Sequence, residues 1–171
     1  MIGHYVRRFF GSLSTRPPSP ADEAWAEAIT TPAEYALYAR LGNTDRRHLV
    51  LGARQVAAEL GPDADPVWVR AALLHDVGKY HADLGVIGRS ASTVCATALG
   101  RDRVQGWSDH PGLRGRFGRY ERHDDVGADE LRAAGSPEVV AEWSALHHHP
   151  ERYAASPIPD AVLAVLDRAD R

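Results

Sequence analysis

The stretch His75-Asp76-Val77-Gly78-Lys79 carries the residues best suited to chemistry in this chain. It follows an apolar helical run, so a histidine, an aspartate and a lysine stand where the pattern would otherwise continue into core. A neutral imidazole binds zinc, iron or manganese, and a carboxylate can bridge two ions. The stretch therefore predicts a divalent metal site whose other ligands lie elsewhere in the chain.

The composition limits which residues those other ligands can be. The single cysteine, Cys95, excludes an internal disulfide framework and a multi-cysteine zinc site, so histidines and carboxylates must hold any metal. A chain with one cysteine also fits a reducing compartment, and we expect a cytoplasmic protein. The net charge of -3 gives no general attraction for a phosphate polymer, which favours a small substrate over bulk nucleic acid.

The length of 171 residues suits one domain preceded by a short tail. Residues 1–13 are basic and aromatic, and 15–20 form a proline-rich stretch typical of a linker. The first segment lacks the apolar core of a signal peptide, and no run in the chain is long enough for a membrane span. A frayed or docked tail is favoured over weak membrane attachment. We expect residues 1–20 to form this tail and linker, and residues 21–171 to form the domain.

The pattern from residue 21 onward is that of helices, and no alternating strand of useful length interrupts it. Over 45–60, apolar residues recur at three- and four-residue spacing, and Gly61-Pro62 ends the helix. Asp65-Pro66 opens a helix that ends at His75-Asp76. Caps, prolines and glycines predict further helices over 24–29, 33–41, 125–134, 137–147 and 160–170. The sequence therefore predicts an all-α domain.

The segment 101–122 is rich in glycine and arginine and is harder to interpret. A solvated basic loop and a wall that faces a phosphate group are equally compatible with this composition. Arginine suits the second role because its planar guanidinium grips phosphate oxygens in a bidentate way. The candidate phosphate contacts in this segment are Arg114, Arg116 and Arg119.

Several metal-binding side chains stand on or at the edges of different predicted helices. Taken singly, a histidine on a helix is more often a hydrogen-bonded structural residue than a ligand. Taken together, they have the arrangement by which a helical bundle directs side chains to one interior point. These candidate ligands are His48, His75, Asp76, His123, His147, His148 and Asp170.

The order of four of these residues resembles a family signature. His48, the pair His75-Asp76 and Asp170 resemble the H…HD…D pattern of the HD-domain metal-dependent phosphohydrolases, and residues 77–79 match its HD-x-G-K form. The resemblance covers residues 45–170. It implies a single HD-domain helical bundle with metal ligands that converge from several helices.

Two further segments resemble the dinuclear subgroup of that family. Residues 120–128, which contain His123, look like its His-x-x-x-Gly-Ala segment, and residues 137–148 look like its helix that ends in a His-His pair. Counting from Pro137 favours His147 and His148 as the pair, and the alternative pair of His148 and His149 stays open.

The resemblance implies two divalent ions, with iron or manganese ahead of zinc or nickel. One ion would be held by His48, His75, Asp76 and Asp170, and the other by Asp76, His123, His147 and His148. With Asp76 as the bridge, ions about 3.5–4 Å apart would share a hydroxide that attacks a phosphate ester. Lys79 would contact the phosphate of the substrate.

The chain departs from two branches of the family. No Gly-Tyr-Pro follows His149, which argues against the cyclic-di-GMP phosphodiesterases of the HD-GYP branch, and the spans of the seven-transmembrane HD phosphodiesterases are absent. We expect a nucleotide or another small phosphomono- or phosphodiester as the substrate. A dinuclear-iron HD-type oxygenase and a non-catalytic nucleotide-binding HD module remain as alternatives. The oligomeric state is left open.

Overall fold

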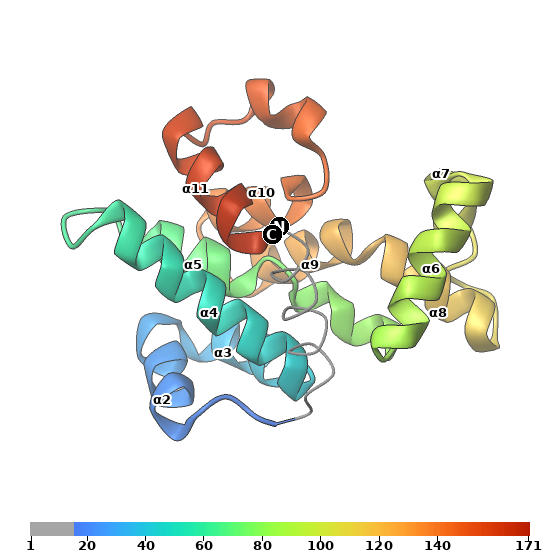
Figure 1. The fold of residues 1–171 in the computed structure, drawn as a ribbon, viewed down its shortest axis with the longest axis horizontal. Coiled ribbons are helices and arrows are strands. Elements are labelled where there is room, and N and C mark those ends of the chain that lie inside the picture. Colours follow the sequence, from blue (N-terminus) through green and yellow to red (C-terminus); the bar gives the residue numbers. More distant parts are fainter. Residues whose placement is uncertain (1–15) are drawn as a thin grey trace, which may run out of the picture.

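The computed structural model describes residues 16–171, so most of the expected tail lies outside the described residues. Over 16–171 the chain folds into helices joined by turns, without a strand, which confirms the all-α prediction (Figure 1). None of these helices is long and apolar enough to cross a membrane.

Two short helices lead into the bundle. Helix α2 (Pro20–Ile29) begins inside the proline-rich stretch, because Ser19 caps it and accepts a hydrogen bond from the Asp22 amide at 3.1 Å. Helix α3 (Pro32–Ala39) begins with a capping box, in which Thr31 and Glu34 bond each other's backbone amides. The cap and the proline therefore start this helix where the sequence predicts.

The centre of the molecule is helix α5 (Val67–Leu74), whose last four residues are buried. Helices α4 (Asn43–Leu60), α10 (Glu138–Leu146) and α11 (Asp160–Asp170) pack around it. Helix α4 buries one face that includes Leu49, Ala53 and Val56, as its apolar spacing predicts. A continuous apolar core thus surrounds the helix that leads to His75.

Helix α9 (His123–Ala133) completes the bundle by packing against α10 and against the 3-10 helix η1 (Val77–Ala82). The contact with η1 requires Gly78, because a Cβ at this position would lie 2.0 Å from the carbonyl oxygen of His123. The Ser144 hydroxyl donates to the His75 carbonyl at 2.8 Å and joins α10 to the end of α5. These contacts bring three histidine-bearing segments to one place.

Helices α6 (Val86–Leu99), α7 (Arg101–Gln105) and α8 (Gly112–Glu121) form an arm beside the bundle (Figure 1). The sequence pattern did not indicate α6, and the loop reading of 101–122 is wrong because most of this segment is helical. Glycines interrupt the helical pattern of this segment, and two of them allow close packing of the backbone. A Cβ at Gly115 would lie 1.7 Å from the His110 carbonyl oxygen, and one at Gly118 would lie 2.3 Å from the Ser108 amide.

The 3-10 helix η2 (Pro150–Ala155) follows α10 and leads into α11. Helix α11 packs against α4 and α5, so Asp170 near the end of the chain returns to residues that come much earlier. The segment predicted over 160–170 is the helix found.

Candidate metal centre

Three histidines at helix ends share one arrangement. His75 and His147 are the residues that follow α5 and α10, and His123 opens α9, with only Arg122 between it and the end of α8. The last carbonyls of a helix lack partners within the helix. Each ring donates through Nδ1 to the carbonyl three residues before it, at 2.8, 2.5 and 2.7 Å for Ala72, Tyr120 and Ser144. Position at a helix end therefore orients each ring.

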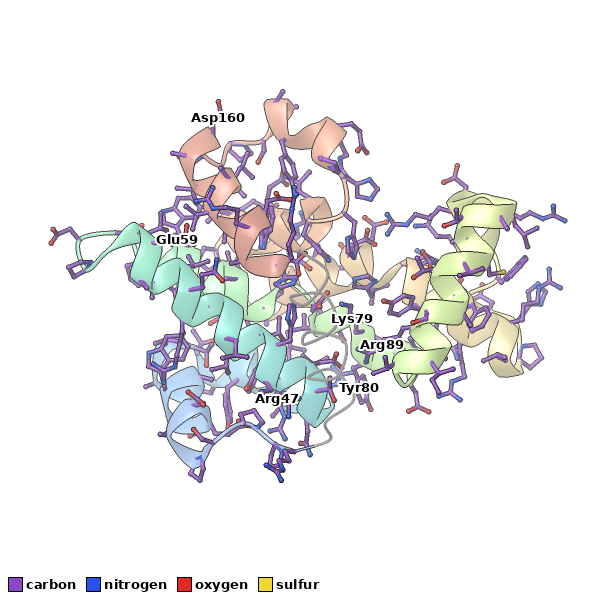
Figure 2. All side chains as sticks on the ribbon, viewed as in Figure 1. Arg47, Glu59, Lys79, Tyr80, Arg89 and Asp160 are labelled. Atoms are coloured by element: carbon purple, nitrogen blue, oxygen red, sulfur yellow. The ribbon has the colours of Figure 1, made fainter. Side chains whose placement is uncertain are left out.

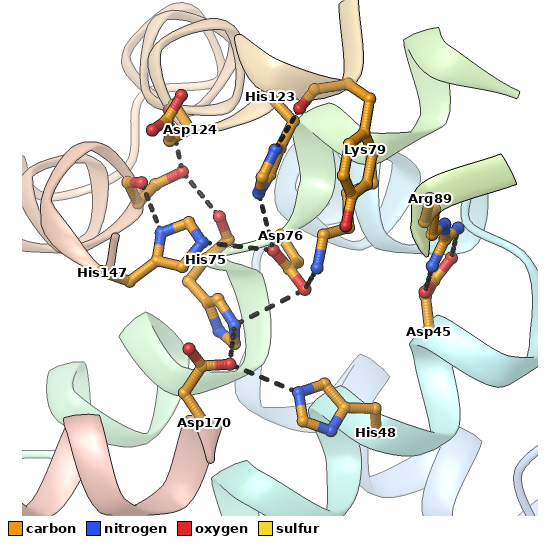
Figure 3. A network of polar contacts seen from close by, with 12 residues as sticks. Asp45, His48, His75, Asp76, Lys79, Arg89, His123, Asp124, His147 and Asp170 are labelled. Atoms are coloured by element: carbon orange, nitrogen blue, oxygen red, sulfur yellow. Dashed lines mark hydrogen bonds and ion pairs between the residues drawn. The ribbon is translucent and has the colours of Figure 1, made fainter. Parts of the chain in front are cut away.

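The orientation of these rings places Nε2 of each opposite a carboxylate. Nε2 of His123 and of His147 lie 3.3 and 3.4 Å from Asp76 Oδ1, and Nε2 of His75 lies 3.6 Å from Asp76 Oδ2 (Figure 3). A neutral imidazole that donates through Nδ1 carries its lone pair on Nε2. A neutral ring of His123 or His147 would therefore turn a lone pair toward Asp76 Oδ1, and two such acceptors repel each other unless a proton or a metal cation lies between them.

The buried polar atoms of this group fit a metal ion. Asp76 Oδ1, His123 Nε2 and His147 Nε2 are buried and have no hydrogen-bond partner within the described part of the chain. Leaving a buried polar atom unsatisfied costs about 1–3 kcal/mol. Because these three atoms converge and all can bind a cation, coordination to a metal would satisfy them together.

A second group of ligands lies beside the first. Nε2 of His48 and of His75 lie 3.4 and 3.0 Å from Asp170 Oδ1. Ligand atoms lie within 4.8 Å of one another in each of three sets, which are His48 with His75 and Asp170, His75 with Asp76 and His147, and His123 with His147 and His148. The structure thus brings all seven predicted ligand side chains together, from five helices or helix ends.

Asp76 and Lys79 form a charged pair inside this cluster. Lys79 Nζ donates to Asp76 Oδ2, and both side chains are largely buried. Burial opposes ionisation of Asp76, but Lys79 and His75 hold its pKa well below the usual range. Burial likewise opposes the charge on Lys79, and the carboxylate of Asp76 outweighs it and raises the lysine pKa. Both groups therefore carry charge at neutral pH.

The two carboxylates also act on the histidines. Burial alone would lower the pKa of His75, but Asp76 and Asp170 outweigh this effect and raise it to about 9. Burial lowers the pKa of His147, although Asp76 opposes it, so this ring is neutral and its lone pair is available. The centre combines two ionised carboxylates with imidazole nitrogens that suit a transition metal.

The structure separates His149 from its two neighbours. Its Nε2 lies 3.2 Å from Asp124 and 3.2 Å from Arg101, and its Nδ1 lies 3.0 Å from Glu151. The ring of His148, in contrast, lies beside that of His147 with ring centroids 4.0 Å apart. The geometry therefore favours His147 and His148 over His148 and His149 as the ligand pair.

The sequence did not indicate that Asp124 and Arg101 lie next to the centre. Asp124 is fully buried, and Arg101 donates to its carboxylate at 2.6 Å and to the carbonyl of Glu121 at 3.1 Å. Burial opposes ionisation of Asp124, but the neighbouring His123 and Arg101 lower its pKa. Only the place of Asp124 directly after His123 hinted at this role.

The structure does not bring Arg114, Arg116 or Arg119 into the ligand cluster. The guanidinium of Arg114 lies over an indole ring at 4.6 Å. Arg116 and Arg119 donate to the backbone carbonyls of Ala82 and His81 at 3.1 and 2.8 Å. These bonds hold α8 against η1, and the positions of the three side chains give no support to the expected contact with substrate.

In this helical bundle, Asp76 lies between two groups of histidine and carboxylate side chains. This arrangement is that of a helical metal-binding protein. A family model described as HD domain matches residues 47–171, a range that contains every residue of the cluster. The chain therefore belongs to the HD domain family, whose members are commonly metal-dependent phosphohydrolases. No curated protein and no solved structure matches the chain.

Proposed function

We propose that the protein hydrolyses a phosphate ester of a small molecule, such as a nucleotide, at a centre for two divalent ions. The observation that carries this proposal is the convergence of two orphaned histidine nitrogens on the orphaned Oδ1 of Asp76, beside the charged Lys79. The proposed ligands are His48, His75, Asp76, His123, His147, His148 and Asp170.

Two bound ions, iron or manganese ahead of zinc or nickel, would supply a water of lowered pKa and neutralise charge on the phosphate oxygens. Asp76 would serve both ions because its two oxygens face different groups of histidines. The bonds from Nδ1 to backbone carbonyls keep the three rings aligned, so little reorganisation is required on binding.

Lys79 would bind and orient the phosphate. Its ammonium stays protonated and lies next to Asp76, where it provides a fixed positive charge for an oxygen of the phosphate. In the reaction, the oxygen of water forms a bond to phosphorus and the bond between phosphorus and the alcohol oxygen breaks. The alcohol leaves with a proton. The second product is inorganic phosphate from a monoester and a phosphomonoester from a diester.

The test compares Asp76→Asn with Asp129→Asn, a matched change at an exposed residue of α9. Metal content is measured by mass spectrometry. Hydrolysis in manganese or iron is measured as release of phosphate from phosphomonoesters and as release of the alcohol from phosphodiesters. We expect Asp76→Asn to lose bound metal and to lower kcat/KM by at least about 100-fold, because a neutral amide cannot replace the bridging carboxylate. Asp129→Asn should match the wild type.

Three other results would contradict the proposal. Equal metal content and equal rates in both variants would exclude Asp76 from the centre. Turnover that requires oxygen and releases no phosphate would favour the oxygenase alternative. Tight nucleotide binding without turnover in any metal would favour the non-catalytic binding module.

A further inference from the structure

An open pocket of about 1020 Å³ adjoins the metal centre on the side of Lys79. It is bounded by the start of α4, by η1 and by the segment that enters α6. Lys79 both lines this pocket and donates to Asp76, so it links the pocket to the ligand cluster. Figure 2 places Lys79, Tyr80 and Arg89 close together in this region. The volume is at the upper end of the roughly 300–1000 Å³ typical of small-molecule sites.

The charges on the pocket wall are balanced. Each acid, lysine and arginine that lines the pocket has an oppositely charged partner, in the pairs Arg40–Glu130, Asp45–Arg89, Lys79–Asp76 and Asp83–Arg116. A second phosphate group in the pocket would have to compete with one of these pairs. An uncharged group would leave them all intact, so the wall favours an uncharged occupant.

The wall also carries planar groups and an exposed apolar side chain. We call the planar groups of Arg40 and Tyr80 the platform. The guanidinium of Arg40 lies 4.1 Å from the centroid of the Tyr80 ring, and 47% of Tyr80 is exposed. Ile87, which is 83% exposed, lines the same pocket. Planar guanidinium and aromatic groups stack on flat rings. The pocket is therefore suited to a group that contains a ring.

We propose that this pocket holds the alcohol part of the substrate, an uncharged group with a flat ring, while the phosphate lies at Lys79. The inference rests on the proposed hydrolysis and narrows it to phosphate esters of ring-bearing, uncharged alcohols. It predicts discrimination against substrates with a second phosphate group.

Gly85 gives a way to fill the pocket without straining the backbone. It precedes α6 with φ -72°, a value that any residue adopts, and a Cβ there meets no atom of the described residues within 4 Å. Because Gly85 lines the pocket, Gly85→Trp adds an indole at its wall, and Gly85→Ala is the matched control that adds only a methyl group. Gly85 is not one of the proposed metal ligands or phosphate contacts.

The experiment measures binding of inorganic phosphate, phenylphosphonate and pyrophosphate to the manganese-loaded protein by calorimetry. Phenylphosphonate carries the ring and the phosphorus group but has no ester bond to hydrolyse. We expect the wild type and Gly85→Ala to bind phenylphosphonate about tenfold more tightly than inorganic phosphate or pyrophosphate. In Gly85→Trp the preference for phenylphosphonate should disappear, while the affinity for inorganic phosphate stays the same. Tyr80→Leu, which removes the platform at a half-exposed position, should reduce the same preference and gives a second variant if Gly85→Trp does not fold.

Failure of this inference is distinct from failure of the proposed function. Phenylphosphonate binding that is unchanged in Gly85→Trp or, where that variant does not fold, in Tyr80→Leu would overturn the pocket assignment. Tighter binding of pyrophosphate than of phenylphosphonate by the wild type would overturn the inference that the occupant is uncharged. If the ligands bind as expected but no ester is hydrolysed in manganese or iron, the pocket stands and the proposed hydrolysis fails.

Discussion

Lys79 is the only lysine in the chain, and every other basic side chain apart from histidine is an arginine. Its side chain is 15% exposed and its ammonium contacts the buried carboxylate of Asp76. An ammonium is a compact point charge, whereas a guanidinium is a broad planar fork that needs more room. The buried position beside the ligand cluster therefore suits lysine, although arginine carries the positive charge elsewhere.

The prediction at this residue concerns Lys79→Met, which keeps the apolar stem and removes the charge. We expect kcat/KM for a phosphate ester to fall about 100-fold, because the phosphate loses a fixed charge in a site sheltered from water. Metal content should be retained, since no proposed ligand changes. Steady-state kinetics and metal analysis of the same preparation measure both quantities. Wild-type kcat/KM in Lys79→Met would remove Lys79 from the proposed site.

The arm formed by α6 to α8 acts on the centre through Arg101 at the start of α7. Arg101 donates to the carbonyl of Glu121 and to buried Asp124, on either side of His123, and lies 3.2 Å from His149, which adjoins His148. One guanidinium thus fixes the start of α9 relative to the turn after α10. We interpret Arg101 as a positioning residue for the proposed ligands His123 and His148.

The prediction for this element compares Arg101→Lys with Arg103→Lys, an exposed position on the same helix. A lysine keeps the charge near Asp124 but lacks the fork that reaches Glu121 and Asp124 together. We expect Arg101→Lys to weaken the site that contains His123 by about 10–100-fold, as changes in groups around metal ligands do. The site that contains His48 should keep its affinity. Metal titration followed by calorimetry separates the two sites, and equal affinities in both variants would contradict the positioning role.

On the scale of the whole molecule, the proposed ligands extend from His48 on α4 to Asp170 on α11. An unfolded chain does not hold these side chains together, so metal binds the folded state preferentially. The bound ions would connect α4 to α11 through His48 and Asp170. Metal binding and folding are therefore thermodynamically linked.

The prediction for the whole molecule is a lower Tm after removal of metal with a chelator. A ligand at about 100 times its Kd stabilises the folded state by about 2.7 kcal/mol. For a chain of this size that corresponds to a shift of about 5–10 °C in Tm. Differential scanning calorimetry with and without manganese measures it, and Asp76→Asn should show no shift. The same Tm for the wild type in both conditions would contradict the linkage.

Several helices, and the candidate ligands at their ends, could be predicted from the sequence because the signals for the helices are local. A histidine at a helix end has free backbone carbonyls nearby, and apolar spacing, caps and prolines delimit α3, α4 and α11. These features depend on residues within a few positions of each other. The sequence by itself therefore determined the helical class and which side chains could bind metal.

Only the tertiary structure decided the roles of Arg101, His149 and the arginines of α8. A guanidinium binds whichever carbonyl or carboxylate the packing of distant segments places near it, and spacing along the chain does not encode that choice. The helices of the arm were missed for the same reason, since Gly115 and Gly118 serve contacts with a backbone segment outside their own helix. The pocket beside Lys79 likewise exists only where α4, η1 and the start of α6 meet.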